Sequence, residues 1–175
     1  ELDTGLASWN LAMGSQALYD WLDEEPERFH PGDLDYIHSV ERIGRLSNVI
    51  SINGGVQLDL MGQENAESAL TRQLSGIGGQ MDFLEGAFRS KGGKGFICIN
   101  SSRVTKDGER RSNIVAAIPS GSTVSAPRTM IDCVATEYGV ARLMGKSLRE
   151  RAEAMASIAH PDFREELLKY AHENF

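Results

Sequence analysis

The sequence has few of the features that mark secreted, membrane-bound or nucleic-acid-binding proteins. Its 175 residues include only two cysteines, Cys98 and Cys133. Both lie in apolar stretches, so we expect reduced, buried thiols in a cytoplasmic protein, although a bridge between the two stays open. No apolar run approaches the roughly 20 residues of a membrane-spanning helix, so no membrane partner is expected. The 18 Lys and Arg residues are outnumbered by 25 Asp and Glu residues, which argues against nucleic acid as a partner.

The beginning of the chain lacks two further features. The residues from Glu1 to Gly5 include acids and have no positively charged region, which a secretory signal needs. The chain also has no initiating Met. We therefore expect a fragment of a longer protein.

Several common catalytic motifs are absent as well. No Gly-x-Ser-x-Gly motif indicates a hydrolase with a nucleophilic serine. A glycine-rich stretch near residue 76 is not followed by the Gly-Lys-Ser/Thr of a phosphate-binding loop, and its spacing does not match a dinucleotide-binding fingerprint. The four histidines are scattered, without metal-ligand spacing to cysteines or carboxylates, so we expect no metal site.

The apolar pattern predicts an α/β fold. Helical patterns cover residues 15–25, 37–46 and 80–88, and most of the C-terminal quarter. Between them lie short runs typical of strands, at residues 8–13, 49–52, 56–60, 95–100, 113–118, 123–126 and 131–135. We expect an open mixed sheet with flanking helices, in a single domain spanning residues 1–175.

Three local signals define individual elements. Asn53-Gly54-Gly55 lies between two strand-like runs and suits a tight hairpin turn. Ser147 and Glu150 have the spacing of a capping box at the start of a helix. Pro161 suits the first position of a further helix, while residues 27–35 are expected to form a loop.

The segment from Ser75 to Phe83 is the strongest local signal for chemistry. Its three glycines, Gly76, Gly78 and Gly79, precede a helical pattern and leave backbone N–H groups uncovered. Such a loop can hold a phosphate or an oxyanion at a helix N-terminus. A tight turn into the helix, with no ligand, explains the same spacing.

Two polar residues follow strand-like runs and are further candidates. The Asn53 amide could donate to a developing oxyanion, or Asn53 could simply form the turn. Glu137 could orient a ligand or take part in catalysis, or it could be a hydrogen-bonded loop acid.

Taken together and in order, several stretches resemble the acetyl-CoA hydrolase/CoA-transferase family, near its 4-hydroxybutyrate CoA-transferases. The similarity runs from about Met13 to the C-terminus. It is carried by residues 51–53 (SIN), 56–63 (VQLDLMGQ), 75–83 (SGIGGQMDF), 90–94 (SKGGK), 136–141 (TEYGVA), 145–147 (GKS), 149–152 (RERA) and 158–164 (IAHPDFR). Each piece alone is weak, and the ordered set is specific.

The resemblance implies a CoA-transferase-type domain, the C-terminal one of two related α/β domains with the active site between them. In the family, a glutamate carboxylate attacks an acyl-CoA thioester, a glutamyl-CoA thioester follows, and a short carboxylic acid collects the CoA. Coenzyme A would thus be a substrate, with no permanently bound cofactor. The implied oxyanion donors are Asn53, Gly78 and Gly79, and the implied CoA-binding residues are Gly76, Gly78, Gly79, Gln80 and Lys91.

The nucleophilic glutamate of the family lies upstream of the segment that matches Met13-Gly14-Ser15. We therefore expect this chain to lack the nucleophile and to be inactive alone, with its own N-terminal domain and further copies of itself as partners. Residues 124–133 (VSAPRTMIDC) depart from the family pattern, which leaves the acyl specificity open. An acyl-CoA hydrolase and a non-catalytic CoA-binding or association module are the alternatives.

Overall fold

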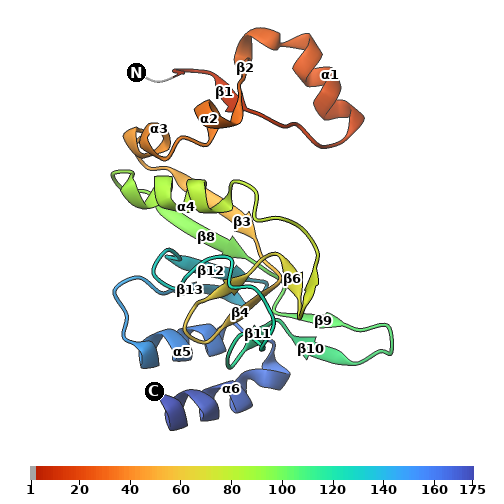
Figure 1. Cartoon of the computed structure of the whole chain (residues 1–175), viewed down its shortest axis with the longest axis vertical. Coiled ribbons are helices and arrows are strands. Elements are labelled where there is room, and N and C mark those ends of the chain that lie inside the picture. The colour runs from red at the N-terminus through yellow and green to blue at the C-terminus, as the bar shows by residue number, and fades with distance from the viewer. Residues whose placement is uncertain (1–2) are drawn as a thin grey trace.

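The computed structural model describes residues 3–175 and divides into an arm, a central sheet and a pair of C-terminal helices (Figure 1). The arm begins with two short strands that pair in parallel and a helix between them. It ends with two short helices that lead to the sheet. These elements are β1 (Ala7–Trp9), α1 (Gln16–Glu24), the 3-10 turn η1 (Pro26–Arg28), β2 (Phe29–Pro31), α2 (Leu34–Ile37) and α3 (Val40–Arg45).

The central sheet confirms the predicted mixed α/β class. Its four strands are β3 (Ile50–Gly54), β8 (Lys94–Cys98), β12 (Cys133–Thr136) and β13 (Gly139–Arg142). They lie in the order β13-β12-β8-β3, with β3, β8 and β12 parallel and β13 antiparallel at the edge. Helix α4 (Gln80–Arg89) connects back to β8, as a helix must between parallel strands.

Smaller sheets surround the carboxyl end of the central one. One has three strands, in the order β11 (Ile114–Val115), β4 (Gln57–Asp59) and β5 (Glu64–Asn65). Two ribbons project from the body, formed by β6 (Ser68–Ala69) with β7 (Arg72–Gln73), and by β9 (Ser102–Val104) with β10 (Arg110–Ser112).

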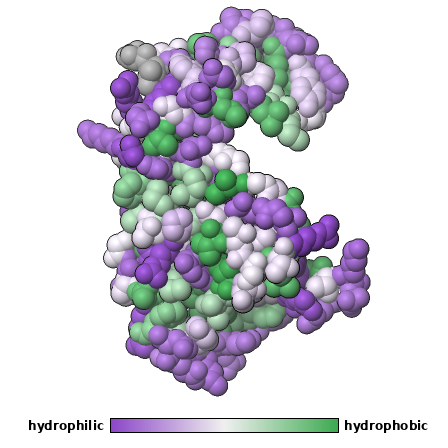
Figure 2. Space-filling model, in the orientation of Figure 1, coloured by the Kyte–Doolittle hydropathy of each residue, from purple (hydrophilic) through white to green (hydrophobic). Residues whose placement is uncertain are grey.

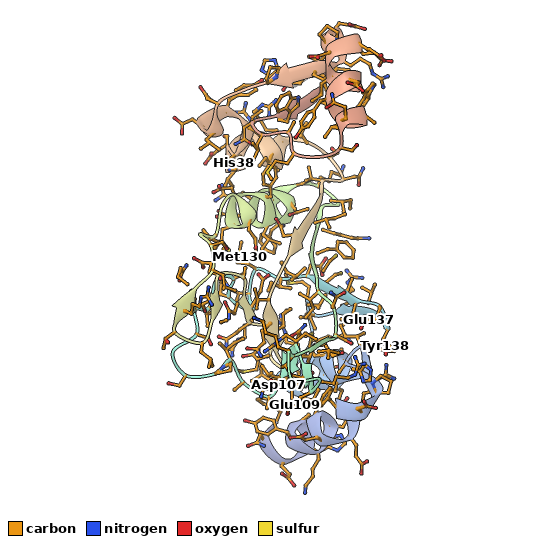
Figure 3. The ribbon with its side chains drawn as sticks, turned by 90° about the vertical axis from the view of Figure 1, so that its right-hand side faces the viewer. His38, Asp107, Glu109, Met130, Glu137 and Tyr138 are labelled. Carbon is orange, nitrogen blue, oxygen red and sulfur yellow. The ribbon has the colours of Figure 1, made fainter. Side chains whose placement is uncertain are left out.

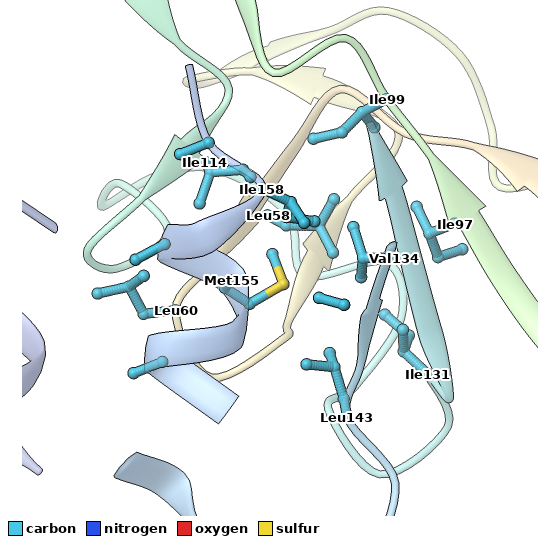
Figure 4. Packing of buried hydrophobic residues seen from close by; sticks show 14 of the residues in the cluster. Leu58, Leu60, Ile97, Ile99, Ile114, Ile131, Val134, Leu143, Met155 and Ile158 are labelled. Carbon is cyan, nitrogen blue, oxygen red and sulfur yellow. The ribbon is translucent and has the colours of Figure 1, made fainter. Parts of the chain in front are cut away.

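Helices α5 (Leu148–Ser157) and α6 (Pro161–Asn174) close the chain. The capping box is confirmed, because the Ser147 hydroxyl accepts from the Glu150 N–H and the Glu150 carboxylate accepts from the Ser147 N–H. Pro161 is the first residue of α6, as predicted. The core lies between α5 and the sheets, as Figure 4 shows for Met155, Leu58 and Val134, which are fully buried.

Only one face of the central sheet is covered by other elements. A Cβ on Gly95 would meet Leu84 of α4, and Gly95 pairs with Ser51, so α4 lies on the face that carries Ser51, Asn53 and Ile97. The opposite, open face carries exposed apolar side chains together with Lys94 and Arg142. Ile50, Ile52 and Val140 there are 51%, 69% and 60% exposed.

Several local predictions are wrong. The Asn53-Gly54-Gly55 segment is not a hairpin turn, because β3 continues to Gly54 and pairs with β8 instead of β4. Residues 27–35 include strand β2. Residues 123–126 form no strand and contribute a single bridge from Ala126 to Glu64.

Two further predictions are corrected. The helix expected over residues 37–46 is split into α2 and α3, because the Ser39 side chain caps a new helix start. The two cysteines are free, as expected, but only Cys133 is buried. Both point to the same face of the sheet, where Cys98 near the end of β8 is exposed. No helix within residues 3–175 has the length and apolar character needed to cross a membrane.

Candidate active site

The carboxyl ends of the three parallel strands meet at one edge of the sheet, where ligands bind in open α/β folds. Asn53 and Gly54 end β3, Asn100 and Ser101 follow β8, and Glu137 follows β12. A groove at this edge is lined by Gly55, Cys98, Ile99, Asn100, Ala135 and Thr136. Parallel pairing, which the sequence does not display locally, brings these residues together.

The Asn53 side chain points to the face that α4 covers. Its amide Nδ2 donates to the Ser51 hydroxyl over 2.8 Å, so one of its two N–H groups is occupied. The side chain is half-buried. Strand β3 thus fixes Asn53, and its second amide N–H has no hydrogen-bond partner among residues 3–175.

Glu137 is held in place by the residue that follows β8. The Ser101 N–H and hydroxyl donate to its two carboxylate oxygens over 2.8 and 2.6 Å. Desolvation raises the pKa of Glu137, but the hydrogen bonds from Ser101, together with its own backbone N–H and His160, lower this pKa below its ordinary value. Glu137 is therefore an oriented, ionised carboxylate near the end of β12, and Figure 3 shows it beside Tyr138.

The glycine loop lies at the start of α4. Gly78 has φ +59°, and a Cβ on Gly76 or Gly78 would meet nothing within 4 Å. Within residues 3–175, no backbone acceptor takes the N–H groups from Gly76 to Gly79. Unpaired N–H groups in a loop with open space beside Gly76 and Gly78 suit an anionic oxygen or an amide carbonyl.

Gly79 has a different neighbour. A Cβ there would stand 2.2 Å from Cε1 of His38, a residue that lies between the arm and α4 (Figure 3). The His38 ring packs edge-on against Phe83, and its Nδ1 lies 3.4 Å from the Asp82 carboxylate. Close packing against His38 therefore explains glycine at position 79 without a ligand.

A groove lies beside this loop, between α2 and the start of α4, while α3 packs against the rest of α4. Figure 2 shows the molecule notched between the arm and the body. The volume of the groove is about 570 Å³, within the usual range for ligand sites. The lining includes three carboxylates and one histidine, together with two of the loop's three glycines: Leu34, Asp35, His38, Ser39, Glu41, Gly78, Gly79 and Asp82. The groove thus has an acidic lining.

Gln80 does not face this groove. Its side chain is buried and donates to the carboxylate of Glu64 on β5. Lys91 is exposed beyond the other end of α4, a ten-residue helix roughly 15 Å long. The structure therefore groups Gly76, Gly78 and Gly79 in one loop, with Gln80 behind them, and does not bring Lys91 to it.

Glu64, His38 and Ser101 have roles that the sequence did not reveal. Each one meets its partner across at least 16 residues of chain, so no local spacing could have indicated the contact. In the part of the chain that the structure describes, no group of three or more His, Cys, Asp or Glu side chains could hold a metal ion.

Comparisons with known proteins agree with this arrangement. The family described as "Acetyl-CoA hydrolase/transferase C-terminal domain" matches residues 14–171. The chain therefore belongs to this family.

Individual relatives include transferases and a hydrolase. A butyryl-CoA:acetate CoA-transferase from Anaerostipes caccae is 41% identical over 97% of this chain and 38% of its own length. A 4-hydroxybutyrate coenzyme A transferase from Clostridium kluyveri is 45% identical over 89% of this chain and 35% of its own. An acetyl-CoA hydrolase from Candida albicans is 32% identical over 90% of this chain and 29% of its own length.

A solved structure shows the same fold. RipA from Yersinia pestis superimposes with a TM-score of 0.85 and 38% identity, over 98% of this chain and 38% of RipA. The chain thus spans well under half the length of the relatives that it matches.

Proposed function

We propose that this chain is the C-terminal part of an enzyme that moves coenzyme A between an acyl-CoA and a short carboxylic acid. The observation that carries the proposal is the loop at Gly76 and Gly78, whose N–H groups have no backbone acceptor and whose Cβ positions are open, in a chain of this family. Butyrate, acetate and 4-hydroxybutyrate occur in the names of its relatives, which supports short acids as substrates.

The charges of the groove indicate which part of coenzyme A it suits. Asp35, Glu41 and Asp82 would repel the phosphates of the nucleotide end. The pantetheine arm and the thioester are uncharged and present amide and thioester oxygens that accept hydrogen bonds. We therefore assign the loop to the pantetheine or the reacting thioester, and Lys91, with its positive charge, to a separate contact with the nucleotide end.

In this proposal the residues of the chain orient the reacting groups. The Gly78 N–H and the free N–H of Asn53 stabilise the oxyanion that forms when a carboxylate attacks the thioester carbonyl. The attacking glutamate is expected upstream of residue 1, and the thioester sulfur leaves with the CoA. Glu137, held by Ser101, is proposed to accept a hydrogen bond from an amide N–H of the pantetheine arm.

The decisive experiment compares this chain with a longer form that includes the upstream polypeptide. Each is given acetyl-CoA and butyrate, and butyryl-CoA is measured by mass spectrometry. We expect turnover by the longer form alone. In the longer form, Gly78→Val should lower turnover at least tenfold, because the side chain would enter the open space before the N–H groups.

Gly108→Val is the matched control. Gly108 also has a positive φ, +81°, and also has nothing within 4 Å of its Cβ position, but it lies on the β9–β10 ribbon. Backbone strain is therefore similar in the two variants. Turnover by residues 1–175 alone, or equal effects of the two substitutions, would overturn the proposal.

The same assay separates the alternatives. A hydrolase would release free CoA and acetate whether or not butyrate is present, and the acetyl-CoA hydrolase relative favours this second function. A non-catalytic module would bind CoA in calorimetry without turnover in either form.

The open face of the sheet supports the upstream polypeptide as a partner. Exposed apolar side chains on this face include Ile50, Ile52 and Val140, and exposed apolar groups of this kind can mark an interface. We propose that the part of the protein that precedes this chain covers it. Self-association and a cytoplasmic location stay predictions, the latter supported by two free thiols.

Cys98 allows a direct measurement of this contact. In the 175-residue chain its exposed thiol should react readily with iodoacetamide, whereas the buried Cys133 serves as the internal control. We expect the upstream polypeptide to slow the reaction of Cys98 at least tenfold. Equal rates with and without it would contradict the assignment of this face.

A further inference from the structure

A buried carboxyl group lies between the two candidate grooves. The groove beside the glycine loop and the groove at the edge of the sheet share no lining residue. Buried Glu64, on β5, lies behind both grooves. Its side chain contacts Gln80, which follows Gly79 of the first groove, and it lies against Gly55 of the second. The residue has no exposed surface.

The contacts of Glu64 place its two oxygens differently. Oε2 accepts a hydrogen bond from the Gln80 side-chain amide, at the first position of α4. Oε1 is buried and has no hydrogen-bond partner within residues 3–175. A Cβ on Gly55 would stand 2.4 Å from Oε1, so only glycine at position 55 leaves room for this oxygen.

The main chain of Glu64 is equally fixed. Its N–H donates to the Ala126 carbonyl over 3.0 Å, and its carbonyl accepts from the Ser125 N–H over 2.7 Å. The backbone from which the carboxyl group projects toward Gln80 is therefore fixed.

The chemical state of the group follows from its surroundings. Burial raises the pKa of Glu64 to about 7, and the hydrogen bond from Gln80 opposes this only in part. The titratable groups on the adjoining elements are engaged elsewhere: Asp59 on β4 with Gln63, Glu67 with Ser125, and Asp82 on α4 beside His38. Among residues 3–175 no cation contributes to the shift, so the buried carboxyl group loses its proton only near neutral pH.

We propose that Glu64 is a positioning residue that, through Gln80, fixes the glycine loop relative to the Asn53–Gly55 end of β3. Gln80 follows Gly79 directly, so a displaced Gln80 side chain would carry the start of α4 and the loop with it. The importance of the loop for CoA transfer rests on the proposed function, but the positioning itself does not.

Hydrogen–deuterium exchange of the 175-residue chain tests the inference without coenzyme A or turnover. Glu64→Leu removes the acceptor of the Gln80 amide and should speed exchange of the backbone amides from residue 77 to 82 about tenfold. Glu64→Gln keeps an acceptor and should restore exchange to within roughly twofold of wild type. Glu67→Gln, three residues away, should leave it unchanged.

A second variant keeps the test decisive if Glu64→Leu does not fold. Gln80→Ala removes the same hydrogen bond from the other side and should speed exchange in the same amides, while those of α5 serve as the unaffected reference. The inference is overturned if either folded variant exchanges its loop amides at the wild-type rate. It is also overturned if Glu64→Gln exchanges them as fast as Glu64→Leu. A protein with the expected exchange but no CoA transfer would count against the proposed function alone.

Discussion

The buried carboxyl of Glu64 should make the stability of the protein depend on pH in a defined direction. Its pKa is about 7 in the folded protein, against an ordinary value of 4.5. Below pH 4.5 both the folded and the unfolded chain hold this proton. Between pH 4.5 and 7 the unfolded chain loses it while the folded protein keeps it, so the free energy of unfolding falls as the pH rises. Above pH 7 both states are ionised and the loss is complete.

The size of the effect follows from the shift. Each pKa unit corresponds to about 1.4 kcal/mol, so the shift predicts a loss of about 3 kcal/mol across this pH window. That is a large part of the 5–15 kcal/mol that typically stabilises a domain. Glu64→Gln has no proton to lose and keeps a similar shape. We expect it to match wild type within about 1 kcal/mol at pH 4 and to exceed it by about 3 kcal/mol at pH 8.

Urea unfolding at intervals from pH 4 to pH 8, followed by far-ultraviolet circular dichroism, measures this difference. The other titrating groups are present in both proteins, so they cancel when the two free energies are subtracted. Glu64→Leu is the matched control, since it also lacks the proton and should show the same pH trend relative to wild type, from a lower starting stability. A difference between wild type and Glu64→Gln that stays constant with pH would refute the reasoning.

Three further predictions concern other contacts. Gly79→Ala should lower the free energy of unfolding by about 1 kcal/mol, because the new Cβ displaces the His38 ring from its contacts. In a His38→Ala background the same substitution should leave the free energy of unfolding unchanged. Denaturant unfolding of wild type, the two single variants and the double variant measures the coupling. Ser101→Ala removes one hydrogen bond to the carboxylate of Glu137 and should raise its pKa, which carbon-13 titration of the carboxyl group detects. Ser147→Ala removes the cap of α5 and should lower the free energy of unfolding by about 1 kcal/mol, while Ser157→Ala near the other end should cost less.

The elements that the sequence predicts correctly are those whose signals are local. The capping box at Ser147, Pro161 at the start of α6, and the apolar spacing of α4 each involve residues within one or two helical turns. The resemblance to the family also identified the chain without any structure, because ordered motifs over most of its length do not depend on how the elements pair.

Pairing over long distances explains what the sequence did not predict. Asn-Gly-Gly between two apolar runs favours a hairpin when only neighbours are considered. In the folded protein β3 gains a parallel partner, β8, more than forty residues later, and this pairing outweighs the local turn preference. The same pairing carries Cys98 to the open face, although its flanking residues are apolar.

The glycine loop shows how far composition and spacing can determine a site. By sequence, Gly78 and Gly79 are equivalent, since both precede the helix and both could present an N–H group to a ligand. The structure separates them: a protein side chain, His38, fills the space beside Gly79, and nothing fills the space beside Gly78. Packing against His38 explains the glycine at position 79. Packing does not explain the open surroundings of Gly78, which has a positive φ. If the loop binds an acyl-CoA, substitutions at Gly78 should impair binding whatever stands at position 38, and those at Gly79 should be tolerated once His38 is removed.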